Sequence, residues 1–169
     1  MRIKFPWVKF LLGFGLYLFF HQIYDLMPGV TGRLFGEGFS SVYAHMKMLF
    51  YAYLVLSIID FFRLRKNSLP VSFFYARMLI LAAVPWMMIA VYYAVEAVGI
   101  ILPHSVDLAW AVVTTFFGLY FSIRLEEPLD GLEMRPALKS VIVIAFLGAL
   151  LTYVGFSFHV PDNFFLAPD

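Results

Sequence analysis

The chain has no cysteine, and charged residues make up only 14% of its 169 residues. Without cysteine it has no disulfide, no thiolate metal ligand and no cysteine nucleophile. A soluble domain usually carries about 25% charged residues, so charge here is too sparse to solvate the exterior of a folded domain. Hydrophobic residues make up 63% of the chain, and the mean hydropathy is +0.87. These proportions predict an integral membrane protein whose surroundings are the lipid bilayer.

The charges also nearly cancel, with 12 basic and 11 acidic residues and a net charge of +1. A chain without a strong positive field has no electrostatic basis for binding nucleic acid. No nucleotide-binding loop, catalytic serine elbow or His-Glu-x-x-His run occurs, and no internal repeat is visible. The sequence therefore predicts a single transmembrane domain over residues 1–169 with no nucleic-acid partner.

Five stretches are apolar over the roughly 20 residues that a spanning helix needs. We therefore expect an all-α integral membrane bundle of five transmembrane helices. The third stretch contains Pro85, which removes one backbone donor and is expected to kink or tilt the helix without splitting it. The predicted spans cover residues 6–24, 42–62, 72–102, 108–123 and 140–158.

The basic residues divide unevenly between the two sides of this bundle. Cytoplasmic loops retain Lys and Arg, so the side with more of them is predicted to face the cytoplasm. With the N-terminus inside, only Arg33 and Lys47 fall on the outer side, which predicts an N-in, C-out orientation. The residues on or near the inner side are Arg2, Lys4, Lys9, Arg63, Arg65, Lys66, Arg77, Arg124, Arg135 and Lys139.

Two charged residues lie inside apolar stretches near the expected inner side. Asp60 is close to the end of the second span, and Arg77 is in the first turns of the third. A charged side chain in hydrocarbon needs a partner, and a hairpin between these spans brings the two residues to similar depth. We predict a structural ion pair between them, direct or through water. The alternatives are side chains that extend to the interface and a role in transport.

Polar residues also gather at the expected outer ends of the first three spans. Residues three and four apart share a helix face, which places His21 beside Tyr17 and Tyr24, and Ser41 beside His45. We predict that His21, Glu37 and His45 border one outer-leaflet pocket, with Lys47 at its rim. The candidate ligand-binding residues are His21, Asp25, Glu37, Ser41, His45, Lys47 and Glu96.

Four interpretations of this outer cluster stay open. Two histidines and a carboxylate suit zinc, iron or manganese, and two histidines on facing helices suit a haem iron. The same groups also suit a ligand or proton pathway. In the fourth interpretation they are partly hydrated interfacial residues that hydrogen-bond to one another. His45 is the strongest functional candidate, because an imidazole changes charge near neutral pH.

Two stretches resemble a family of small bacterial polytopic membrane proteins to which no function is assigned. One runs over residues 37–47 and contains Ser-Val-Tyr-Ala-His-Met-Lys from Ser41 to Lys47, and the other is the Phe- and Pro-containing tail from Phe156. The family motif is Ser-Val-Trp-Glu-His-x-Lys, so Tyr43 and Ala44 depart from it. The resemblance implies a multi-pass protein of the bacterial cytoplasmic (inner) membrane. If the family's Glu is functional, Glu37 replaces it here or the activity is missing.

The function that these patterns favour is a transport-related or ligand-binding membrane protein with an outer-leaflet site. An alternative is a membrane enzyme acting on a lipid-like substrate, with His45 as general base oriented by Glu37 or Asp25. A third is a non-catalytic anchor or assembly subunit. Candidate protein partners are a second copy of the chain or another membrane protein, and the identity of any cofactor stays open.

Overall fold

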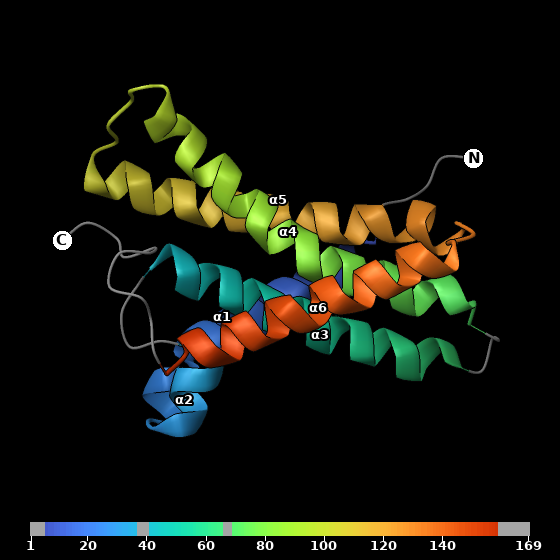
Figure 1. Ribbon diagram of the computed structural model, residues 1–169. Helices are drawn as coiled ribbons and strands as arrows, with labels where there is room; N and C mark the ends of the chain where they lie inside the picture. The colour runs from blue at the N-terminus through green and yellow to red at the C-terminus, as the bar shows by residue number, and fades with distance from the viewer. Residues whose placement is uncertain (1–5, 37–40, 66–68, 159–169) are drawn as a thin grey trace.

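The computed structural model describes residues 6–36, 41–65 and 69–158, and within these ranges every regular element is a helix. The all-α prediction is therefore confirmed. Figure 1 shows the long helices running roughly along one direction, with the short helix α2 at one end. The helices are α1 (Trp7–Leu26), α2 (Val30–Phe35), α3 (Val42–Leu64), α4 (Val71–Ala97), α5 (His104–Asp130) and α6 (Pro136–Phe156).

Helix α3 is the centre of the fold. It contacts α1, α2, α4 and α5, and every residue from Val42 to Tyr53 is buried. Because this half of α3 is covered on all faces by protein, its polar side chains can be held inside the bundle. Helix α6 packs on α4 and also meets α3, where the Tyr43 hydroxyl donates to the Tyr153 carbonyl at 2.8 Å.

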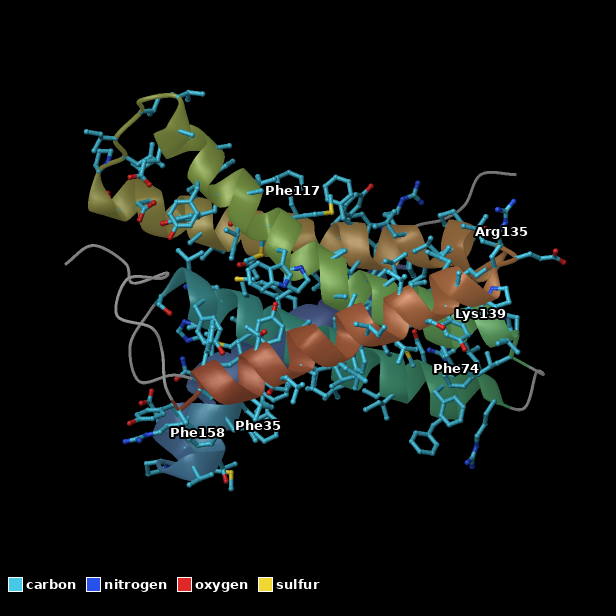
Figure 2. The ribbon with its side chains drawn as sticks, in the orientation of Figure 1. Phe35, Phe74, Phe117, Arg135, Lys139 and Phe158 are labelled. Carbon is cyan, nitrogen blue, oxygen red and sulfur yellow. The ribbon has the colours of Figure 1, made fainter. Side chains whose placement is uncertain are left out.

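The alternating helix directions give the bundle two different ends. Figure 2 shows Arg135 and Lys139 at one of them, which we call the basic end; α3 and α5 finish there, and α4 and α6 begin there. Phe35 and Phe158 lie at the opposite end, together with α2, and we call this the α2 end.

Four helices are long and apolar enough to cross a membrane: α3, α4, α6 and the part of α5 from Ser105 to Asp130. This agrees with the prediction of a polytopic membrane protein. Helix α1, with 20 residues, is not among the four. The polar residues Lys9, His21, Gln22 and Asp25 lower its mean hydropathy.

The third predicted span is too long at its C-terminal end, since α4 stops at Ala97 and not at residue 102. Gly99 has φ +81°, a left-handed conformation that favours glycine. The Gly99 amide donates to the Glu96 carbonyl, and the Ile100 amide donates to the Val95 carbonyl. These two bonds form a Schellman cap. Pro85 lies within the continuous helix and does not split it, as expected.

The fourth predicted span, residues 108–123, is too short, because α5 extends from His104 to Asp130. The prediction ended this span before the charged residues that begin at Arg124. In the structure these residues complete the helix, and two of their carboxylates are held by basic side chains from other helices. Helix α6 begins earlier than predicted, with Pro136 in its first turn, a position where its missing N–H has no intrahelical acceptor.

Candidate functional site

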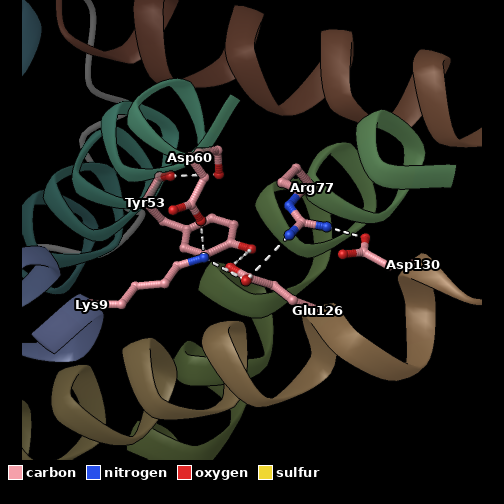
Figure 3. Close-up of polar contacts among 7 residues, drawn as sticks. Lys9, Tyr53, Asp60, Arg77, Glu126 and Asp130 are labelled. Carbon is pink, nitrogen blue, oxygen red and sulfur yellow. Dashed lines mark hydrogen bonds and ion pairs between the residues drawn. The ribbon is translucent and has the colours of Figure 1, made fainter. Parts of the chain in front are cut away.

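Charged side chains from four helices meet inside the basic end of the bundle (Figure 3). Charged residues inside membrane-spanning segments are costly and mark functional sites, so this group is the primary candidate site. We call it the ionic cluster. It consists of Lys9 from α1, Tyr53 and Asp60 from α3, Arg77 from α4, and Glu126 and Asp130 from α5.

Glu126 is the centre of the ionic cluster. One of its oxygens, Oε2, accepts hydrogen bonds from Lys9 Nζ and from Arg77 Nη2, the latter at 3.3 Å. The other, Oε1, accepts from the Tyr53 hydroxyl at 2.8 Å. With three donors around a buried carboxylate, the negative charge of Glu126 is well compensated. This side chain therefore joins α1, α3, α4 and α5.

Asp60 and Asp130 flank this centre on opposite sides (Figure 3). Lys9 Nζ also binds Asp60 Oδ2, and Arg77 Nη1 binds Asp130 Oδ1. Asp60 and Arg77 were predicted to interact directly or through water, and in the structure they are connected by a chain of ion pairs that runs from Asp60 through Lys9 and Glu126 to Arg77. The prediction considered only the hairpin of α3 and α4, whereas α1 and α5 supply the intervening charges.

Among the residues that the structure describes, the cluster holds three carboxylates and two basic groups. Side-chain exposure ranges from 7% for Arg77 to 27% for Asp130, so the cluster is largely shielded from solvent. Asp60, at 13%, has one basic partner, Lys9, and shares it with Glu126. One carboxylate is therefore in excess among these described residues. Asp130 likewise has one basic partner, Arg77, but Asp60 is the less exposed of the two.

At the α2 end, the structure brings His21 and His45 together. Their ring centroids are 5.8 Å apart, with His21 exposed and His45 buried. His45 Nδ1 is hydrogen-bonded to the Tyr17 hydroxyl at 2.5 Å, and the Thr115 hydroxyl lies next to Tyr17. These contacts form a polar path from the surface at His21 inward to α5.

Lys47 is fully buried, although it was predicted at the rim of a pocket. Its ammonium donates to the carbonyls of Arg33 and Gly36, both at 2.8 Å, and to the Ser157 hydroxyl at 3.2 Å. The prediction allowed for a lysine that extends to the interface. Instead, α2 folds over the start of α3 and presents its carbonyls inward, so the ammonium links α2 and α6 to α3.

The other predicted residues have different positions and contacts. Ser41 caps α3 by accepting the Ala44 amide at 3.0 Å, and Asp25 is exposed near the end of α1. Glu96 lines a separate groove beside the connection between α4 and α5. Glu37 lies outside the described residues. Within the described part of the chain, no group of three or more His, Asp or Glu side chains is arranged to hold a metal ion.

Sequence reasoning missed most of the ionic cluster. Lys9 was counted only as a topology signal, and Glu126 and Asp130 lie beyond the end of the fourth predicted span. Their spacing of four residues places both carboxylates on one helix face, which was an available signal. Tyr53 gives no such signal, because a single tyrosine in an apolar helix is more often a packing residue.

No family model, curated protein or solved structure matches the chain. The family resemblance stays a prediction, and the functional argument depends on the geometry of this chain.

Proposed function

We propose that this chain is a proton-carrying, transport-related protein of the bacterial cytoplasmic membrane. In this proposal it crosses the membrane five times with its N-terminus inside, and the ionic cluster takes up and releases one proton at Asp60. The observation that carries the proposal is the excess of one carboxylate over the basic groups in a shielded cluster joined by four helices.

The packing of α1 supports a fifth crossing. Near its start, Lys9 reaches Asp60 in the last turns of α3, and near its end His21 lies beside His45 in the first turn of α3. Helix α1 therefore runs antiparallel to a spanning helix over most of its length. Its 20 residues amount to about 30 Å of helix, which is about the thickness of the hydrocarbon core.

The distribution of basic residues supports the proposed orientation. Of the basic residues that the structure describes, only Arg33 and Lys47 belong to the α2 end. The others belong to the basic end, which the positive-inside rule assigns to the cytoplasm. The ionic cluster then lies toward the cytoplasmic side and the two histidines toward the outer side.

The charge imbalance supports proton uptake at Asp60. An unmatched carboxylate shielded from water is unfavourable, and protonation removes the excess charge. Glu126 accepts three hydrogen bonds and Asp130 is the most exposed of the three acids, so both tolerate their charge better than Asp60. Because the three carboxylates are coupled through Lys9 and Arg77, a proton is shared by the whole cluster, and Asp60 is the less exposed of the two acids that flank Glu126.

An apolar layer separates the ionic cluster from the histidine end. Gly13 of α1 and Leu119 of α5 lie between the two polar regions. The backbone at Gly13 packs closely against the side chains of Leu56 and Leu119, because a Cβ added there would lie 3.0–3.1 Å from them. Leu49 of α3 is also buried between His45 and Tyr53. Polar groups at both ends with an apolar layer between them favour the transfer of one proton at a time over flow through an open water path.

The proposal is tested with the full-length protein in vesicles that contain a pH-sensitive dye. A potassium diffusion potential, negative inside, drives protons inward, and the wild-type protein is expected to acidify the interior faster than protein-free vesicles do. Asp60→Asn removes the proton-carrying group and is expected to lower the rate to that of protein-free vesicles.

Glu127→Gln is the matched control, because Glu127 is an exposed neighbour of Glu126 and no ion pair holds it among the described residues. It is expected to retain the wild-type rate. Wild-type vesicles that acidify no faster than protein-free vesicles would contradict the proposal, as would an Asp60→Asn variant that is folded and fully active.

A further inference from the structure

A groove beside the connection between α4 and α5 is separate from both polar regions described above. It lies at the end of the bundle opposite the ionic cluster and has a cavity volume of about 150 Å³, which corresponds to roughly five water molecules. Its walls combine aromatic rings, two carboxylates and aliphatic side chains of the connecting segment. The residues that carry the argument are Tyr92, Tyr93, Glu96, Asp107 and Trp110.

The aromatic walls of the groove are fixed in place. The rings of Tyr92 and Tyr93 are nearly perpendicular, with an interplanar angle of 87° and centroids 5.1 Å apart, so they form a corner. The Tyr92 hydroxyl donates to Asp107 at 2.8 Å, and the Trp110 indole N–H donates to the Tyr92 carbonyl at 3.1 Å. These bonds tie the third ring, on α5, to the corner on α4.

The electrostatics of the groove favour a cation. Glu96 and Asp107 both line it, and no basic side chain is among the described residues that do. Neither carboxylate takes part in an ion pair within the described part of the chain. The faces of tyrosine and tryptophan rings also attract cations, with tryptophan the strongest. Aromatic faces and unmatched carboxylates thus independently point to a positively charged ligand.

We propose that this groove binds a small organic cation with a methylated ammonium group. A metal ion needs a shell of oxygen ligands in return for its lost water, whereas both oxygens of Asp107 already accept from Tyr92 and the rest of the wall is largely apolar. A methylated ammonium is weakly hydrated and fits an aromatic corner with a nearby carboxylate. The cavity volume of about 150 Å³ suits such a headgroup.

The test uses the full-length protein in nanodiscs, with choline as the probe and tryptophan fluorescence as the readout, since Trp110 lines the groove. Choline is expected to change the fluorescence saturably, and Trp110→Phe is expected to remove that change. The neutral isostere 3,3-dimethyl-1-butanol has the same shape without the charge and is expected to bind at least about tenfold more weakly. Glu96→Gln is expected to weaken choline binding about tenfold, the effect of losing one partly shielded charge interaction.

Glu133→Gln is the matched control, because Glu133 is exposed at the basic end, far along the bundle from the groove. It is expected to leave choline binding unchanged. Asp60→Asn is also expected to leave choline binding unchanged, so the outcome of this test does not depend on the proposed proton function. Three outcomes would overturn the inference: no saturable change with choline, equal binding of the neutral isostere, or equal weakening by Glu96→Gln and Glu133→Gln.

Discussion

At the scale of the residue, Lys47 shows how this protein stabilises a fully buried charge. Among the described residues, its ammonium donates to two carbonyls of the α2 segment and to the Ser157 hydroxyl after α6. Lys47→Met keeps the length of the side chain but leaves these acceptors without their donor. Buried acceptors left unsatisfied cost about 1–3 kcal/mol, so the free energy of unfolding is expected to fall by roughly 2–4 kcal/mol, measured by denaturation in detergent.

Lys139→Met is the matched control for this change. The Lys139 ammonium lies 5.4 Å from the centroid of the Tyr75 ring, at the edge of the bundle. A partly exposed cation–π contact contributes about 0.5–1 kcal/mol, so this variant is expected to lose less than about 1 kcal/mol. Equal losses for the two variants would show that Lys47 is not held as described.

The ionic cluster makes a second prediction at this scale. Lys9 and Asp60 are in direct contact, whereas Asp60 and Arg77 are connected only through other residues. In double-mutant cycles, Lys9→Met with Asp60→Asn is therefore expected to show a coupling energy above about 1 kcal/mol. The cycle of Asp60→Asn with Arg77→Gln is expected to show a smaller one. A larger coupling for the second cycle would favour a direct pair between Asp60 and Arg77.

At the scale of the element, the short helix α2 depends on a glycine that packs against α1. A Cβ added at Gly32 would lie 2.5 Å from the Met27 carbonyl oxygen and 3.0 Å from the Tyr24 Cα. Both are backbone atoms and cannot move aside cheaply. Gly32→Ala is thus expected to destabilise the protein by about 1–3 kcal/mol.

Gly15→Ala in α1 is the control, because a Cβ there would have no atom within 4 Å, and its stability is expected to stay within about 0.5 kcal/mol of wild type. Since α2 also supplies the acceptors of Lys47, Gly32→Ala and Lys47→Met are expected to be non-additive. Full additivity would mean that α2 and Lys47 act independently.

The elements also show what the sequence could and could not predict. Long apolar stretches predict α3, α4 and α6 to within a few residues, because hydrophobic length is a local property. The extent of α5 was not predictable from hydropathy, because Glu126 and Asp130 remain helical through partners on α1 and α4. Likewise, nothing local to Lys47 indicates that α2 will cover it. The errors occur where a polar residue depends on a distant segment.

At the scale of the whole molecule, the proposed five-crossing topology can be tested by introducing single cysteines, because the chain has no cysteine of its own that would react. Met27, at the α2 end, and Ile101, in the connection between α4 and α5, are both exposed. A single cysteine at either position is expected to react with a membrane-impermeant maleimide on intact cells. Cysteines at Arg65 and Glu133, or placed before Met1, are expected to react only after the cells are opened.

The cysteine placed before Met1 is the decisive position for α1. If it reacts on intact cells as readily as the one at Met27, both ends of α1 lie on the outer side and the helix does not cross. If Met27 and Ile101 are protected while Arg65 reacts, the whole orientation is reversed and the cluster faces outward.

The central claim is that Asp60 takes up a proton within the ionic cluster, and infrared difference spectroscopy of the protein in nanodiscs tests it most directly. When the cluster takes up a proton, the wild type is expected to gain the C=O stretching band of a protonated, weakly hydrated carboxyl group. Asp60→Asn is expected to lack this band, and Glu127→Gln to retain it. The claim would be contradicted if the wild type gained no such band, or if the band persisted in folded Asp60→Asn.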